Sequence, residues 1–211
     1  MINKILIVLF FCFTNNFIFF ELKSQIKNNI VVKVGNSLIS SIDIQNEIIT
    51  SIIINKQKIT QTNIDNYKNY AIKKLIKSTI KRNEIEKYDV KNYDPIALNN
   101  YIDNVAKNLN TNKVGLKKIF TETGINYDLF VNNHRTELLW NTLIFQIYNN
   151  QININIIEVE NEIEKIKEKK SLDELKKIKK TILLKRKEEK LDLFSRSHFS
   201  NLENLVSIDF Q

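Results

Sequence analysis

The sequence contains very little glycine and proline. Three glycines (Gly35, Gly115 and Gly124) and one proline (Pro95) occur among its 211 residues. Sandwiches, barrels and nucleotide-binding α/β folds need these residues for their turns and phosphate loops. Their scarcity excludes those fold classes and predicts a mainly α-helical chain.

Cysteine is nearly absent as well. The single thiol, Cys12, lies in an apolar run at residues 5–13 that follows Lys4, which is the pattern of a secretory signal peptide. Polar residues interrupt the apolar stretch before it reaches the roughly 20 residues of a membrane span, which favours cleavage over anchoring. We therefore expect residues 1–24 to be a signal peptide cleaved after Ser24, and the protein to be periplasmic. The mature chain would then have no disulfide.

The formal net charge is +8. Basic residues alternate with acidic ones along most of the chain, as is typical of solvated helix faces. A positive charge also suits nucleic acid, an anionic membrane surface or acidic clients, although salt would screen such steering. The predicted export signal opposes a nucleic-acid-binding function.

Turn and capping signals divide the first two thirds of the chain into elements. Two short strands are predicted at residues 31–34 and 37–39, around the turn-forming pair Gly35-Asn36. Ser40 and Asp43 have capping-box spacing, so a helix is predicted from there to about residue 55. Further helices are predicted, after a polar loop at residues 60–62, at about 63–88, 95–109, 113–123 and 127–149. The last of these should be the most buried, because its second half is apolar nearly all round.

The last third of the chain begins with a short alternating segment, and its composition becomes more highly charged near residue 170. The alternation at 152–155 predicts a brief strand or extended linker, and Asn155 with Glu158 predicts a helix that ends near residue 170. Ser171 with Glu174 predicts another helix start, and residues 205–210 alternate like a terminal strand. We expect one principal domain at residues 25–165, and a C-terminal helix and strand at 166–211 that pack back on it.

Residues with recognisable catalytic or metal-binding spacing are missing. His134 and His198 stand far apart and outside any zinc motif, so no metal site is predicted. Three glycines cannot supply a nucleophile elbow and an oxyanion loop. The acidic residues between 158 and 164 are better explained as an exposed helix face than as an acid/base pair. We therefore expect no enzyme activity and no cofactor.

Several stretches resemble the N-terminal domain of the SurA family of periplasmic chaperones. They are IVVKVGNSLISSIDIQNEI (30–48), AIKKLIKSTIKRNEIEKYDV (71–90), and GINYDLFVNNHRTELLWNTLI (124–144) running into QININIIEVENEI (151–163). Residues 178–210 resemble the family's C-terminal helix and closing strand. The resemblance implies a multi-helix domain whose small N-terminal hairpin is completed by the C-terminal helix and strand.

The resemblance also implies a function. SurA-like chaperones bind unfolded outer-membrane proteins without ATP, between helices that present apolar and aromatic side chains. The family places parvulin-type isomerase domains where this chain has only a charged connector, between residues 163 and 178, so no isomerase activity is expected. The candidate client-binding residues are Tyr101, Phe120, Tyr127, Phe130 and Trp140. Side chains of this kind at helical spacing are more often core residues than client contacts.

A second interpretation belongs to another class of protein. If residues 5–20 stay uncleaved, the chain is a membrane-tethered scaffold whose helices bind one dedicated partner. In both interpretations the chain could form a homodimer, for example by exchange of its C-terminal helix.

Overall fold

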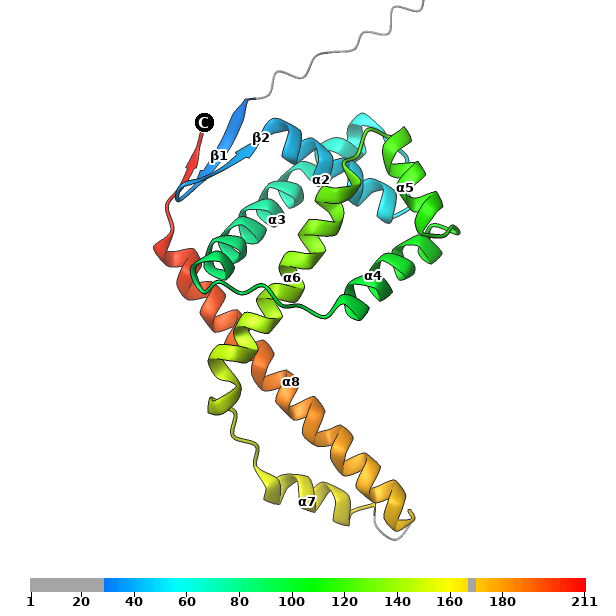
Figure 1. The fold of residues 1–211 in the computed structure, drawn as a ribbon, viewed down its shortest axis with the longest axis vertical. Coiled ribbons are helices and arrows are strands. Elements are labelled where there is room, and N and C mark those ends of the chain that lie inside the picture. Colours follow the sequence, from blue (N-terminus) through cyan, green and yellow to red (C-terminus); the bar gives the residue numbers. More distant parts are fainter. Residues whose placement is uncertain (1–28, 167–169) are drawn as a thin grey trace, which may run out of the picture.

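The computed structural model describes residues 29–166 and 170–211. The predicted signal peptide lies outside the described residues. The described part is mainly helical, as predicted, with a small three-stranded sheet (Figure 1). Its elements are β1 (Ile30–Val34), β2 (Ser37–Ser40), α2 (Ser41–Ile54), α3 (Gln61–Lys87), α4 (Pro95–Asn108), α5 (Lys113–Glu122), α6 (Tyr127–Tyr148), the 3-10 turn η1 (Asn149–Gln151), α7 (Ile156–Glu164), α8 (Leu172–Leu205) and β3 (Ile208–Phe210).

Local capping chemistry sets most helix boundaries. Ser40 and Asp43 form the predicted capping box at the start of α2, and Ser171 and Glu174 form another at the start of α8. At the end of α5, Gly124 has a φ of +74°, and the next residue donates its N–H to the carbonyl of Phe120 at 2.8 Å. This is a Schellman motif, in which a glycine takes the left-handed conformation at low cost.

One local prediction was wrong. Thr60 caps α3 through its hydroxyl, so the helix begins at Gln61 inside the segment predicted as a loop. Of the two predictions for residues 152–155, a brief strand or an extended linker, the structure shows the linker, which connects η1 to α7. Among the described residues no strand lies beside this segment to pair with it.

The sheet brings together the first and the last strand of the described residues. β1 lies in the middle and pairs antiparallel with β2 on one side and with β3 on the other, where Val32 faces Phe210 and Val34 faces Ile208. Val32 and Val34 are fully buried. The C-terminal helix and strand thus complete the N-terminal hairpin, as predicted.

Three hydrophobic clusters form the body. One joins the sheet, α2 and α3; the second joins α4, α5 and the first half of α6; the third joins the ends of α3 and α6 to the second half of α8. α6 runs through the centre of the body (Figure 1). It is not the most buried helix, because Phe145 near its end is 44% exposed and α3 buries more of its residues.

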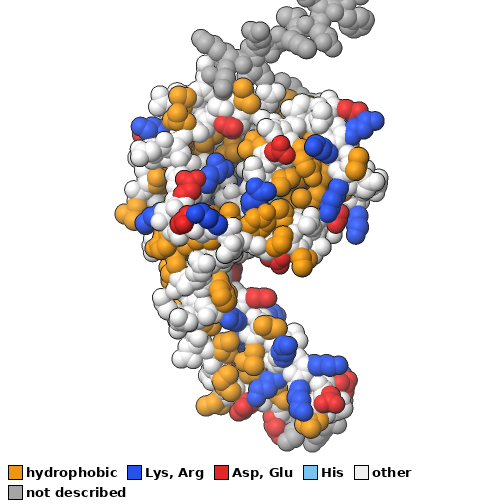
Figure 2. Space-filling view, in the orientation of Figure 1, with side chains coloured by type: hydrophobic (Ala, Val, Ile, Leu, Met, Phe, Trp, Pro, Cys, Tyr) orange, Lys and Arg blue, Asp and Glu red, His pale blue; other side chains and the backbone are white. Residues whose placement is uncertain are grey.

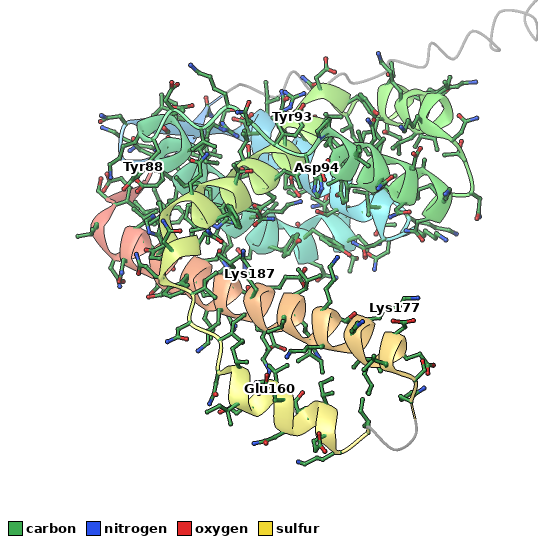
Figure 3. The ribbon with its side chains drawn as sticks, turned by 60° about the horizontal axis from the view of Figure 1, so that its bottom comes forward. Tyr88, Tyr93, Asp94, Glu160, Lys177 and Lys187 are labelled. Atoms are coloured by element: carbon green, nitrogen blue, oxygen red, sulfur yellow. The ribbon has the colours of Figure 1, made fainter. Side chains whose placement is uncertain are left out.

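The first half of α8 leaves the body and pairs with α7 as a projecting hairpin, which we call the arm (Figure 1). Val159 of α7 is fully buried against it. Lys179 binds Glu160 at 3.1 Å, and Arg186 binds Glu162. Figure 3 shows these two helices side by side, with Lys177 and Lys187 on the side of α8 away from α7. Among the described residues, none of the helices is long and apolar enough to span a membrane.

Candidate functional site

Four of the five candidate client-binding residues form one aromatic cluster. The ring of Phe130 lies 5.0 Å from that of Phe120, 5.8 Å from that of Tyr101 and 6.0 Å from that of Tyr127. These residues come from α4, α5 and α6, so the cluster joins three helices. Phe120 and Phe130 are buried, whereas Tyr101 and Tyr127 are partly exposed. Only the two tyrosines can therefore touch a partner without opening the core.

Trp140 lies apart from this cluster. It is 1% exposed and packs under α8, where its indole N–H donates to the Ser195 hydroxyl at 2.8 Å. Its ring also contacts the rings of His198 and Phe199. The structure therefore places Trp140 where α6 and α8 are held together, and not on a surface that a client could reach.

His198 is a residue whose role the sequence did not reveal. Its Nδ1 lies 2.8 Å from the Tyr148 hydroxyl, and its Nε2 lies 3.3 Å from the carboxylate of the buried Glu84. These contacts link α3, α6 and α8 through one imidazole. No sequence motif predicts this arrangement, because Glu84, Tyr148 and His198 lie far apart in the chain and meet only when α8 packs on the body.

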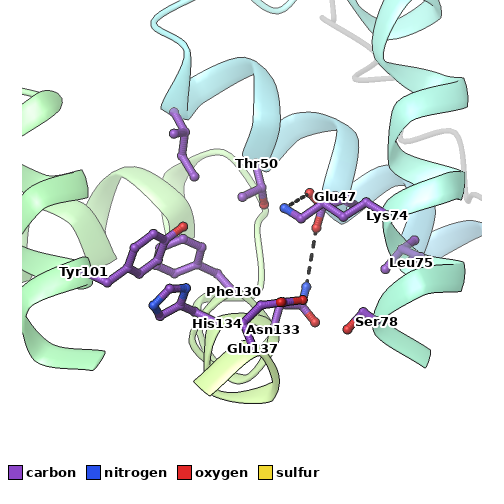
Figure 4. Close-up of a pocket in the computed structure, with 11 residues that line it drawn as sticks. Glu47, Thr50, Lys74, Leu75, Ser78, Tyr101, Phe130, Asn133, His134 and Glu137 are labelled. Carbon is purple, nitrogen blue, oxygen red and sulfur yellow. Dashed lines mark hydrogen bonds and ion pairs between the residues drawn. The ribbon is translucent and has the colours of Figure 1, made fainter. Parts of the chain in front are cut away.

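A pocket opens beside the aromatic cluster (Figure 4). α2, α3, α4 and α6 all contribute to its wall, and its volume is about 80 Å³. The residues that line it are Glu47, Thr50, Ile54, Lys74, Leu75, Ser78, Tyr101, Phe130, Asn133, His134 and Glu137. We call it the α2–α6 pocket. Tyr101 and Phe130 are the two sequence-predicted residues that reach it.

One wall of the pocket holds an ion pair, and a second pair reaches the wall through Glu137 alone, because Lys81 does not line the pocket. Glu47 is 3% exposed and accepts from Lys74 Nζ at 2.5 Å and from Asn133 Nδ2 at 3.4 Å. Burial alone would lower the pKa of Lys74, but the attraction of Glu47 and the hydrogen bond to it outweigh burial and raise it. Lys81 forms the second pair, with Glu137 at 2.5 Å. The four charges therefore neutralise one another.

The opposite wall is aromatic. The rings of Tyr101 and His134 stack almost parallel with centroids 3.5 Å apart. Burial raises the pKa of Tyr101, although Lys74 opposes this rise. Burial lowers the pKa of His134, which Lys74 also lowers and Glu137 opposes. His134 is therefore a partly exposed residue whose lowered pKa favours the neutral form.

The lowered pKa of His134 predicts a pH effect on stability. The unfolded chain binds the proton with a pKa of about 6.5, above that of the folded chain, so His134 stabilises the fold fully above that pH and loses its contribution as the pH falls below it. We expect the free energy of unfolding to fall more between pH 7.5 and pH 5 in the unmodified chain than in His134→Asn, which cannot be protonated. Urea unfolding at both pH values measures this. An identical pH dependence in the two proteins would contradict the prediction.

A second opening, the α2–α3 groove, is wider and more apolar. Its volume is about 490 Å³, and it lies between β1, α2 and the start of α3. Its apolar residues are Val31, Ile44, Ile48, Ile49 and Ile64, and its polar ones are Ser41, Gln45, Gln61, Asp65 and Lys68. An isoleucine-lined groove with a polar rim is the form of an interaction site for apolar segments.

Apolar side chains also gather on the face drawn in Figure 2. They lie between α6 and the pair formed by α4 and α5, with Lys and Arg side chains around them. We call this surface, together with the aromatic cluster beneath it, the aromatic region. Its partly exposed residues include Ile53, Ile54, Tyr101, Tyr127, Val131 and Leu138. The sequence alone does not show which of these apolar residues are partly exposed and which are fully buried. The apolar stripe of a helix has the same spacing whether it faces a core or a surface groove.

Metal-binding clusters of His, Cys, Asp and Glu are absent from residues 29–166 and 170–211. No protein-family model matches the chain, and no curated protein was found to be similar to it.

Proposed function

We propose that the protein is an ATP-independent periplasmic chaperone that binds unfolded outer-membrane and other exported proteins and has no isomerase activity. The observation that best supports this proposal is the α2–α3 groove, whose apolar walls are open to solvent. An extended client segment that inserts one or two apolar side chains there would bury modest apolar area. Such binding is weak and reversible, because association must also offset the ordering of the client.

The aromatic region supplies a second apolar contact. Tyr101 and Tyr127 are the members of the predicted set that a client would touch. Phe120 and Phe130 would act from beneath by holding the tyrosine rings in place. In this proposal Trp140 binds no client.

The groove can be tested with matched variants. The chain from residue 25 onwards is expected to suppress aggregation of a denatured outer-membrane β-barrel protein at stoichiometric ratio without ATP, measured by light scattering. Ile64→Gln in the groove should weaken suppression by up to roughly tenfold, or about 1.4 kcal/mol, because Ile64 is already partly buried against the core and a client can add only part of the about 1.5–3 kcal/mol of full burial. Ile96→Gln is the control, because Ile96 is 69% exposed and does not line the groove.

Suppression by the parent chain should also survive moderate salt, because an apolar contact is not screened. No suppression by a folded, helical chain would contradict the chaperone proposal.

The arm favours a second candidate function, that of a scaffold bound to one dedicated partner. At least three ion pairs join its two helices, and Ile157, Leu172 and Leu184 remain more than half exposed. A projecting helical hairpin that is held together by ion pairs and has exposed apolar side chains is suited to binding a defined partner surface. If the folded, helical parent chain does not suppress aggregation in the test above, the scaffold function becomes the preferred proposal.

A further inference from the structure

The two helices of the arm carry opposite charge. α7 has four glutamates and no basic residue. The part of α8 that pairs with it, residues 172–187, has seven basic and two acidic residues, a net charge of +5. Lys179 and Arg186 of α8 face α7 and form ion pairs with three of its glutamates, and the fourth, Glu164, also has a partner. The acidic helix therefore uses only part of the positive charge of α8.

The side of α8 away from α7 holds lysines without carboxylate partners. Lys177, Lys180, Leu184 and Lys187 follow one another at intervals of three and four residues, so they lie within an arc of about 80° and along roughly 15 Å of the helix. We call these four residues the outer face of the arm. Figure 3 shows Lys177 and Lys187 on this side. Within the part of the chain that the structure describes, the three lysines form no ion pair.

The outer face combines these charges with exposed apolar surface. Leu184 is 52% exposed and lies about one turn from Lys180 and from Lys187. At the end of the face nearest the body, Lys187 Nζ lies 4.9 Å from the ring centroid of Phe145, which is itself 44% exposed. Aligned lysines around an apolar side chain favour a ligand that carries both carboxylates and apolar groups.

Two other occupants fit this face less well. The arm of a second copy has no free acidic helix to offer, because all four glutamates of α7 already have partners within the chain. A helix that lies in a membrane surface needs a continuous apolar face. The outer face has one leucine among three lysines, and the exposed Leu172 points about 120° away from Leu184 around the helix. The observations therefore favour an acidic protein segment.

We propose that the outer face of the arm binds an acidic protein segment. Glutamate or aspartate side chains of that segment pair with Lys177, Lys180 and Lys187, and an apolar side chain packs on Leu184. The site lies outside the α2–α3 groove and the aromatic region, so it does not rest on the chaperone function. For the scaffold function, it specifies the chemistry of the dedicated partner.

The binding experiment uses the full chain and a fluorescent peptide of about ten residues, which spans roughly 15 Å as a helix. The acidic peptide presents glutamates and a leucine on one face, and its neutral twin has glutamine in place of every glutamate. Fluorescence anisotropy at low salt should show about tenfold tighter binding of the acidic peptide, since three exposed charge pairs contribute about 0.2–1 kcal/mol each. Binding should weaken as salt is added. Equal binding of the two peptides, or none, would overturn the proposal.

Two charge variants test where the acidic peptide binds. The first replaces the lysines of the outer face by Lys177→Gln, Lys180→Gln and Lys187→Gln. The control changes the net charge equally at three exposed lysines of α3 and α4, by Lys73→Gln, Lys77→Gln and Lys107→Gln. The first variant should bind the acidic peptide about tenfold more weakly than the control, and both should keep the helical circular dichroism of the parent. Equal loss in both variants would show that the peptide responds only to net charge and would overturn the site.

A leucine pair tests the apolar contact. Leu184→Gln should weaken binding of the acidic peptide about three- to tenfold, because the peptide can cover the exposed half of this side chain. Leu193→Gln is the matched control: Leu193 is 53% exposed on the same helix, but nine residues further on it points to the opposite side. If the two substitutions have the same effect, Leu184 is not part of the site.

Three further measurements separate the other occupants and the chaperone function. An oligomer that is seen by sedimentation velocity and lost in the lysine variant of the outer face would overturn the acidic partner in favour of a second copy. Binding to vesicles of anionic lipid that needs the same lysines, without binding to the acidic peptide, would overturn it in favour of a membrane surface. Aggregation suppression should be equal in the parent and the lysine variant, since the groove lies elsewhere. Loss of suppression in the lysine variant alone would place the outer face in the client site and overturn a separate partner.

Discussion

Replacement of Lys74 by methionine is expected to lower the free energy of unfolding by about 2–3 kcal/mol. The substitution keeps most of the side-chain volume but removes the charge that faces the 3% exposed Glu47. Breaking a fully buried ion pair costs about 3–5 kcal/mol, and the 43% exposure of Lys74 lets water reduce this. Urea unfolding followed by circular dichroism measures the change.

Two further variants separate this effect from a general loss of charge. Lys73→Met changes the neighbouring exposed lysine and should alter stability by less than about 0.5 kcal/mol. Adding Glu47→Gln to Lys74→Met should recover part of the loss, because the buried carboxylate is then gone. If Lys74→Met and Lys73→Met are equally mild, the Glu47–Lys74 pair does not stabilise the fold.

The substitution Trp140→Ala should destabilise the fold by about 3–5 kcal/mol and release α8 from the body. The tryptophan is almost fully buried and joins α6 to α8 through one hydrogen bond and two ring contacts. Truncation of such a side chain leaves a cavity as well as lost contacts. Denaturant unfolding gives the stability, and limited proteolysis shows whether cleavage sites appear in the second half of α8.

Phe145→Ala is the matched control for this prediction. Phe145 is another large aromatic residue of α6, but it is 44% exposed and its ring has Lys187 Nζ 4.9 Å from its centroid. Its loss should cost no more than about 1 kcal/mol and should leave α8 resistant to protease. Equal effects of the two substitutions would show that Trp140 does not hold the helices together.

The sequence predicted the fold well where the signals are local. Capping boxes at Ser40 and Ser171 and the glycine end at Gly124 depend on neighbours within a few residues, so they could be recognised without any tertiary information. The terminal strand was also predicted, because alternation over residues 205–210 is the pattern of a half-buried strand.

The pocket and the α8 contacts depend on residues far apart in the chain. Glu47 lies in an isoleucine-rich helix, and only the approach of Lys74 and Asn133 explains why a carboxylate is buried there. The sequence analysis placed Trp140 in the same candidate set as the four clustered aromatic residues. The apolar pattern of a helix does not show which other element covers a given side chain, so the contact with α8 could not be predicted. His198 was considered only as a possible metal ligand, and its partners Tyr148 and Glu84 lie 50 and 114 residues away in the chain.

The position of β1 between β2 and β3 has a consequence for the timing of folding. Val32 pairs with Phe210, so the middle strand of the sheet gains its second partner only after residue 210 has been synthesised. At about 5–20 residues per second the ribosome needs roughly 10–40 s to reach that residue. During that time one edge of β1 is open, and Val32 and Val34 lack the cover of the C-terminal strand. The sheet of the nascent chain therefore closes later than the hairpin and helices that come before α8.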